Sequence, residues 1–242
     1  MKKGYLVIGA GGGIGKATCD LLLKGGNQVV GAVRDIGAIA AGLKVDGVDY
    51  RSVDAEDWDS VDALFEDLIA EGFPLSGVAL CVGSILLKPA HLTRKEEFDG
   101  VISKNLSSAF ATVRAGSKSL SKTGGSIVLV STAAAQHGLA NHEAISAAKA
   151  GVEGLVRSAA ATYAKRQIRV NCVAPGLVRT PLSERITANP SSLEMSEKMH
   201  PLGRIGEAIE VARAITWLLS SDQGWITGQT IGVDGGLSSL RV

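Results

Sequence analysis

The sequence predicts a doubly wound α/β fold, a parallel sheet of about seven strands flanked by helices on both faces. Three observations support this class. Short apolar runs alternate with longer stretches of helical periodicity along the chain. The apolar runs are nearly continuous, as expected for parallel strands that are covered on both faces. The first run ends in a glycine-rich turn, and a helical pattern begins directly after it.

The expected strands are short and rich in Val, Ile and Leu. They are expected at residues 5–8, 29–33, 78–82, 127–130, 168–174 and 230–233, with a weaker strand at 49–53. Helical patterns lie between them, at residues 14–24, 58–71, 95–120, 143–165 and 207–220. Because β-α-β crossovers are right-handed, this alternation predicts a parallel sheet. No linker or repeat divides the chain, so residues 1–242 are expected to form a single domain.

One stretch between the expected elements, residues 180–201, is polar and irregular. It contains Pro181, Pro190 and Pro201 and follows the sixth expected strand. It is therefore expected at the carboxyl edge of the sheet, where ligands bind in such folds. A loop of this length in that place indicates a substrate lid. The alternative is a surface excursion without a role.

Composition limits the class of partner. The chain has 25 Lys and Arg against 24 Asp and Glu, so no basic surface for nucleic acid or an anionic membrane is expected. The apolar run at 5–8 is too short for a signal peptide, and no window approaches the ~18 apolar residues of a membrane span. Three widely spaced cysteines favour a reducing, cytoplasmic location, and the four histidines lack metal-ligand spacing.

The glycine-rich turn predicts a dinucleotide site of the Rossmann type. It lies between the first expected strand and a helix, which is the context that this motif requires. Glycine lets the backbone approach a pyrophosphate and adopt positive φ. The helix N-terminus then offers free N–H groups to that phosphate. The expected binding residues are Gly9, Gly11, Gly12, Gly13, Ile14 and Gly15.

The residues after the second strand favour NADP(H) over NAD(H). An acidic side chain there would bind the ribose 2′-OH, whereas a basic one accommodates a 2′-phosphate. Val33 stands where the acid would be, and Arg34 follows it. A guanidinium suits a phosphate. Asp35 leaves the preference open, because it could neutralise Arg34.

The landmarks along the chain resemble those of the short-chain dehydrogenase/reductase family. Gly9-x-x-x-Gly13-x-Gly15 is similar to its first motif, with Ile8 in place of the usual threonine. Further matches follow in the family's order: Asp54 after the third strand, Asn105 in the fourth helix, the Pro-Gly motif at 173–180, and C-terminal signatures at 201–204, 226–229 and 233–236. The resemblance covers essentially the whole chain and implies a nicotinamide-dependent enzyme.

The resemblance also implies where the rest of the cofactor binds. It assigns Asp54 to the adenine, and Val178 and Thr180 to the nicotinamide carboxamide. The family's motif after the fourth strand reads Leu80-Cys81-Val82-Gly83 here, so only its glycine is retained. Besides the glycine-rich turn, the expected cofactor residues are Arg34, Asp54, Ala55, Gly83, Lys149, Pro175, Gly176, Val178 and Thr180.

The family's catalytic unit, Ser followed by Tyr-x-x-x-Lys, is altered in this chain. Lys149 matches the lysine, which in the family binds the ribose and lowers the tyrosine pKa. Ile145 stands at the tyrosine position, and Thr132, preceded by Ser131, stands at the serine position. Thr132 or Ser131 can still hold a carbonyl oxygen. Ile145 cannot donate a proton, and loss of a general acid typically costs ~10²–10⁴-fold in rate. Asn105 and Lys149 would support the cofactor and a water chain.

His142 is the candidate for the missing proton donor. It lies on the same helical face as Ile145, and histidine titrates near neutral pH. The alternative is that His142 is an ordinary residue at the start of its helix, with Asn141 as the N-cap. The catalytic candidates are thus Thr132, Ser131, Lys149, Asn105 and His142.

Three functions are compatible with these residues. The first is an NADP(H)-dependent oxidoreductase acting on a small carbonyl or secondary alcohol. The second is a cofactor-binding sensor or partner subunit without redox turnover. The third is an isomerisation or elimination on the same scaffold. Small residues in the helices at 95–120 and 143–165, together with the resemblance, imply a dimer or homotetramer; close packing within one subunit would need the same composition.

Overall fold

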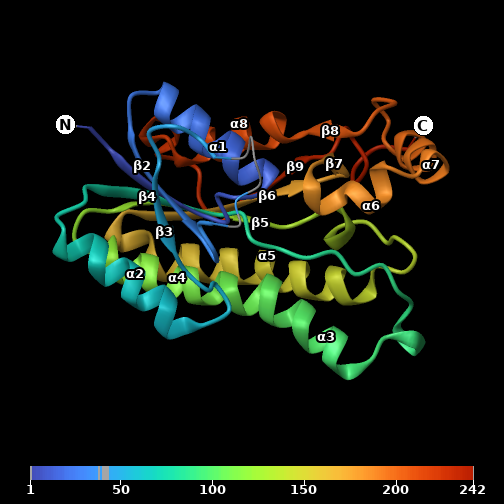
Figure 1. Ribbon diagram of the computed structural model, residues 1–242, viewed down its shortest axis with the longest axis horizontal. Helices are drawn as coiled ribbons and strands as arrows, with labels where there is room; N and C mark the ends of the chain where they lie inside the picture. The colour runs from blue at the N-terminus through green and yellow to red at the C-terminus, as the bar shows by residue number, and fades with distance from the viewer. Residues whose placement is uncertain (1, 38, 40–43, 242) are drawn as a thin grey trace.

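A seven-stranded parallel sheet forms the centre of the molecule in the computed structural model, which describes residues 2–37, 39 and 44–241 (Figure 1). The strand order is β3-β2-β1-β4-β5-β6-β9, and the order reverses at β1. The strands are β1 (Gly4–Ile8), β2 (Gln28–Val33), β3 (Asp49–Ser52), β4 (Leu75–Leu80), β5 (Gly125–Val130), β6 (Ile168–Pro175) and β9 (Thr230–Val233). The predicted doubly wound class is therefore confirmed.

Helices cover both faces of this sheet (Figure 1). The α-helices of the described residues are α1 (Gly13–Lys24), α2 (Trp58–Ala70), α3 (Lys95–Ile102), α4 (Ser108–Ser119), α5 (Glu143–Tyr163), α6 (Glu184–Thr187), α7 (Pro190–Met199) and α8 (Ala208–Leu219), of which α6 and α7 lie beyond the end of the sheet. Side chains alternate along β1: Leu6 and Ile8 join the core under α2, α4 and α5, whereas Tyr5 and Val7 join the core under α1 and α8. Burial on both faces explains why the strands read as continuous apolar runs.

The helix expected at 95–120 is interrupted. A π-helical segment, Ser103–Ser107, separates α3 from α4. Within it, the buried Asn105 amide donates to Val101 O at 2.9 Å and to Ser84 Oγ at 2.8 Å. A π segment places one extra residue in a turn and is frequent at functional sites. Here it directs Asn105 towards the chain that follows β4.

Residues 180–201 are not irregular, which corrects the sequence prediction. A short 3-10 turn (Pro181–Ser183), α6 and α7 occupy most of the stretch. Proline favours the first position of a helix, where its missing N–H has no partner. Pro190 opens α7, and the Asn189 side chain caps it by accepting from Ser192 N at 3.0 Å.

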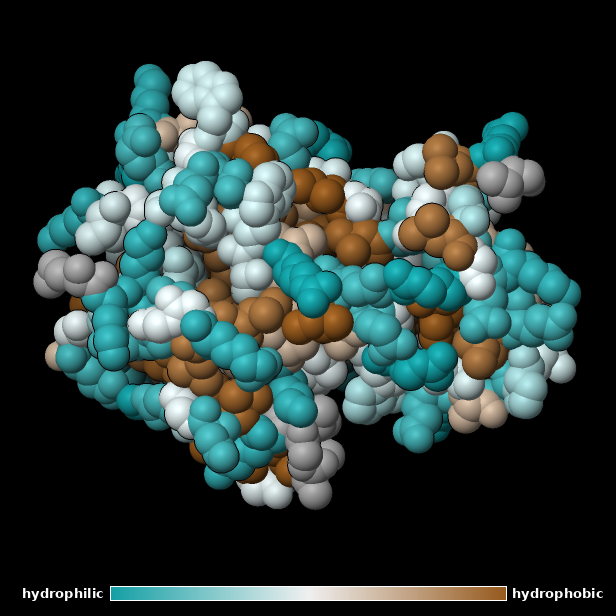
Figure 2. Space-filling model, turned by 90° about the horizontal axis from the view of Figure 1, so that it is seen from above, coloured by the Kyte–Doolittle hydropathy of each residue, from teal (hydrophilic) through white to brown (hydrophobic). Residues whose placement is uncertain are grey.

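The two ends of the α6–α7 segment are held together. The two-residue strands β7 (Val178–Arg179) and β8 (Gly206–Glu207) pair in parallel at its base. Leu182 and Met195 are exposed apolar side chains on the segment. Figure 2 shows hydrophobic residues scattered among hydrophilic ones across this side of the molecule. Among the described residues, none of the helices has the length and apolar character required to cross a membrane.

Candidate active site

The glycine-rich turn forms a cradle that excludes most side chains. A Cβ on Gly15 would overlap Gly9 O, and one on Gly9, at φ +87°, would lie 2.8 Å from the carbonyl carbon of Cys81. A Cβ on Gly13 would lie 2.9 Å from the Thr180 methyl group. A Cβ added at Gly11 or Gly12 would lie no closer than 3.4 Å to any neighbouring atom, so the packing of the turn does not require glycine at these two positions. The close backbone approach and the helix that begins at Gly13 fit a dinucleotide pyrophosphate.

Arg34 lies beside two carboxylates at the ends of β2 and β3. Its Nη2 is 2.7 Å from Glu56 Oε1 and 3.3 Å from Asp54 Oδ1. The hydrogen bond to Glu56, followed by the charge of Asp54, raises the pKa of the Arg34 guanidinium. Asp35 instead accepts a hydrogen bond from Gly37 N at 2.8 Å. Asp35 therefore does not pair with Arg34; the carboxylates that do are Asp54 and Glu56, and sequence reasoning missed Glu56.

Lys149 and Asn105 converge on Gly83 from two different helices. A Cβ at Gly83 would lie 3.1 Å from Asn105 Oδ1 and 3.6 Å from Lys149 Nζ. Lys149 is 6% exposed, and its Nζ donates to Val130 O at 2.7 Å. Burial lowers the pKa of Lys149 to about 8. These three predicted residues are therefore brought together at the carboxyl ends of β4 and β5.

The turn after β6 carries the other predicted cofactor residues. Pro175 ends β6, and the Thr180 methyl group packs against Gly13, so this turn lies beside the glycine-rich turn. Val178 is 6% exposed and its side chain belongs to the core. Of the two remaining predicted positions, Ile14 packs against the same core cluster as Val178, whereas Ala55 is buried in the core on the other face of the sheet.

Thr132, His142 and Ile145 line one pocket of about 170 Å³ next to this turn. The Thr132 hydroxyl makes only long contacts, 3.5 Å to Pro175 O and 3.4 Å from Ala134 N. His142 Nδ1 lies 2.7 Å from Ala140 O, which orients the ring. The other lining residues are Ile85, Leu87, Ala133, Ala134, Leu139, Gly176, Leu177, Ile186, Ser196, Met199, His200 and Leu237. Apart from its two histidines, this lining carries no ionisable side chain.

Two expectations at this site differ from the structure. Ser131 is 3% exposed and its hydroxyl donates to Glu153 Oε1 at 2.8 Å, so it faces α5 instead of the pocket. Thr132 is thus the only hydroxyl of the pair that lines the pocket. Asn141 does not cap α5: it has φ 64°, and His142 occupies the N-cap position without a side-chain cap bond.

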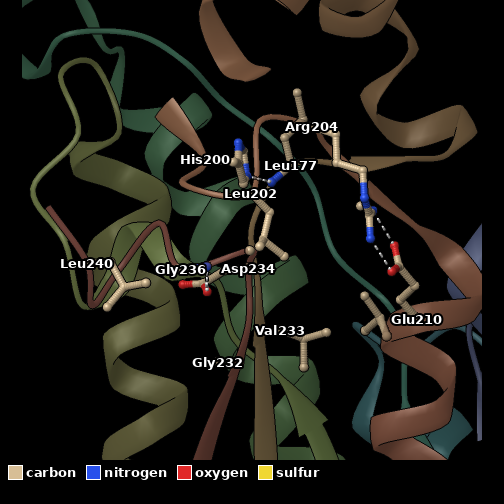
Figure 3. Close-up of a pocket in the computed structure, with 13 residues that line it drawn as sticks. Leu177, His200, Leu202, Arg204, Glu210, Gly232, Val233, Asp234, Gly236 and Leu240 are labelled. Carbon is tan, nitrogen blue, oxygen red and sulfur yellow. Dashed lines mark hydrogen bonds and ion pairs between the residues drawn. The ribbon is translucent and has the colours of Figure 1, made fainter. Parts of the chain in front are cut away.

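His200 is a buried polar residue that sequence reasoning missed. Its Nδ1 lies 2.6 Å from Ser196 O in α7, and its Nε2 accepts from Leu177 N at 3.2 Å. These bonds assign the proton to Nδ1. Figure 3 shows His200 and Leu177 on one side of a neighbouring cavity of about 420 Å³, with the Arg204–Glu210 ion pair across it. His200 therefore joins α7 to the turn after β6.

The fold and the glycine cradle together are typical of dinucleotide-binding α/β proteins. Comparison with known proteins identifies the family. Residues 9–238 match the family model described as enoyl-(acyl carrier protein) reductase. The chain belongs to the short-chain dehydrogenase/reductase family.

Individual relatives match over nearly their whole length. The cis-4-hydroxycyclohexanecarboxylate dehydrogenase of Sinomonas cyclohexanicum is 36% identical, over 97% of this chain and 96% of the relative. The 2,5-dichloro-2,5-cyclohexadiene-1,4-diol dehydrogenase of Sphingobium indicum is 34% identical, over 98% of both. The structure of ElxO with NADP bound superposes with a TM-score of 0.91 at 25% identity, covering 99% of this chain and 100% of ElxO.

Proposed function

We propose that this protein is an NADP(H)-dependent oxidoreductase that interconverts a carbonyl group and a secondary alcohol. One observation carries the proposal: a single pocket contains the Thr132 hydroxyl and His142, and Gly176 of the cofactor turn forms part of its wall. The names of the relatives, dehydrogenases of ring alcohols and 3-oxoacyl reductases, support this reaction class. Arg34 at the end of β2 supports the preference for a 2′-phosphate.

The proposed roles follow from the hydrogen-bonding capacity of each side chain. A nicotinamide cofactor supplies hydride transfer when bound. Thr132 has a hydroxyl whose existing contacts are long, so it is available to donate to a substrate carbonyl oxygen. The His142 ring binds Ala140 O through Nδ1. Its Nε2 is therefore left to hold or release a proton at the substrate's carbonyl oxygen.

Lys149 and Asn105 are assigned to the cofactor side. Lys149 is positively charged for the most part at neutral pH even with its pKa lowered to about 8. It would bind the ribose hydroxyls of the cofactor, which is the role that the family resemblance implies for this lysine. Ile145, at the position of the family's tyrosine, supplies an apolar wall and no proton. This arrangement is the altered catalytic unit that we propose.

The pocket favours an uncharged, apolar substrate. Its walls are mainly aliphatic, and an anionic group would find no lysine or arginine in its lining. Ile186 and Met199 come from the α6–α7 segment, which supports a lid role for that segment. By resemblance we further infer a cytoplasmic dimer or homotetramer, with three free cysteines consistent with a reducing compartment.

The test compares NADPH consumption by the wild type, Ile145→Tyr and His142→Gln against a panel of ketones, diketones and quinones. We expect turnover by the wild type. His142→Gln should lose about 10²–10⁴-fold in kcat. A kcat of His142→Gln equal to that of the wild type would refute His142 as the donor. If only Ile145→Tyr turned over substrate, while all three proteins bound NADPH, the oxidoreductase proposal would be wrong for the natural chain.

A further inference from the structure

Arg34, the residue assigned to the ribose 2′-phosphate, is already engaged in a network of charges. Its guanidinium contacts Glu56 at 2.7 Å and Asp54 at 3.3 Å. Lys104 Nζ approaches the same Glu56 oxygen, Oε1, at 3.7 Å. Two cations and two carboxylates therefore meet at the ends of β2 and β3, where the cofactor's adenosine half is expected.

The two side chains of the Arg34–Glu56 ion pair differ in how exposed they are. The Glu56 side chain is 24% exposed and lies between Arg34 and Lys104. Its backbone N–H donates to Asp54 Oδ1 at 3.0 Å, which orders the turn before α2. The Arg34 side chain is 60% exposed. Arg34 therefore has room to turn towards a ligand, whereas the Glu56 carboxylate is held between two cations.

We propose that Glu56 sets how strongly the protein discriminates between phosphorylated and unphosphorylated dinucleotides. The inference rests on the proposed function, since it requires the cofactor site described above. The Glu56 carboxylate competes with the 2′-phosphate for Arg34, and it also repels that phosphate. NAD(H) has no 2′-phosphate, so neither effect applies to it. Glu56 thus weakens the binding of NADP(H) and leaves that of NAD(H) unchanged. It thereby reduces the preference for NADP(H) over NAD(H) that Arg34 creates.

The expected size of the effect follows from the exposure of the pair. Exposed ion pairs contribute little, about 0.2–1 kcal/mol, so competition alone changes affinity by less than about fivefold. Loss of like-charge repulsion adds to this in the same direction. Glu56→Gln should therefore tighten NADPH binding by about three- to tenfold and change NADH binding by less than about twofold.

The experiment measures dissociation constants for NADPH and NADH by the cofactor's own fluorescence, at one fixed salt concentration. Glu66→Gln is the matched control, because Glu66 lies further along α2 in an exposed pair with Lys118 at 3.1 Å. It makes the same change in net charge away from Arg34. The double variant Arg34→Ala/Glu56→Gln tests whether the gain depends on Arg34. Circular dichroism confirms that each variant is folded.

Each outcome decides the proposal. Tighter NADPH binding in Glu56→Gln alone supports it, provided that the gain is smaller between Arg34→Ala and the double variant, where only like-charge repulsion is removed. An equal gain in Glu66→Gln, an equal gain for NADH, or a gain as large without Arg34 as with it overturns it. If the wild type and all variants bind neither cofactor, the proposed function itself fails. That result differs from the failure of this inference alone, in which the wild type binds cofactor and Glu56→Gln binds NADPH no better.

Discussion

Replacement of Lys149 by methionine tests whether this lysine is as deeply buried as its contacts indicate. The side chain is 6% exposed and donates one hydrogen bond, to Val130 O at 2.7 Å. Burial lowers its pKa from 10.5 to about 8. Methionine has a similar length and no charge, so Lys149→Met removes the desolvated charge with little change in volume.

The sign and the magnitude follow from linkage. Because the pKa of Lys149 is lower in the folded state, the unfolded chain binds more protons between about pH 8 and 10.5. Its burial penalty is therefore complete below the folded pKa and is relieved as the pH rises. The lowered pKa of Lys149 corresponds to a burial penalty of about 3 kcal/mol in the free energy of unfolding. About 2 kcal/mol of this penalty disappears between roughly pH 7 and 9.5. Wild-type stability should rise by that amount relative to Lys149→Met.

The assay is urea unfolding of both proteins without cofactor across that pH range. Comparing the difference between the two proteins removes the titration that they share. Lys118→Met, at an exposed helix position, is the control and should differ from the wild type by less than about 0.5 kcal/mol throughout. A Lys149→Met difference that stays constant with pH would show that the ammonium is solvated, and would refute the burial argument.

Two further predictions concern the hydroxyl pair and the glycine cradle. Ser131→Ala should lower the free energy of unfolding by about 1–3 kcal/mol, because it removes a partner of the buried Glu153. The kcat of Ser131→Ala should be nearly unchanged. Thr132→Val should keep the wild-type stability and lose about 10²–10³-fold in kcat. If steady-state assays gave the reverse pattern, Ser131 and not Thr132 would be the hydroxyl that acts on the substrate. Gly15→Ala should abolish NADPH binding, since its Cβ would meet backbone. Gly100→Ala, in open space on α3, should bind normally and gain about 0.5–1 kcal/mol in denaturant titrations.

Sequence patterns within a short segment predicted those features that depend only on the residues of that segment. The continuous apolar strands predicted a sheet covered on both faces, and the two core clusters agree with that prediction. The resemblance to the family's catalytic unit assigned Thr132 and Ile145 to one site, and both line the same pocket. Residues 180–201 were misread because prolines suggested an irregular loop, although Pro190 opens a helix.

Contacts between side chains that are far apart in the sequence could not be predicted from such patterns. Arg34 and Glu56 meet because β2 and β3 pair in a register that aligns Val33 with Ser52. Ser131 and Thr132 are neighbours with similar side chains, yet only one of them lines the pocket.

The sequence by itself determined the sheet and the glycine cradle, because these depend on periodicity and steric size within short segments. The altered catalytic unit rests on the family resemblance and stays a proposal. The tertiary structure alone decided which carboxylate pairs with Arg34, which hydroxyl faces the pocket, and how His200 joins α7 to the turn after β6. Each of those contacts depends on strand register and helix packing, which bring together residues whose spacing along the chain carries no signal.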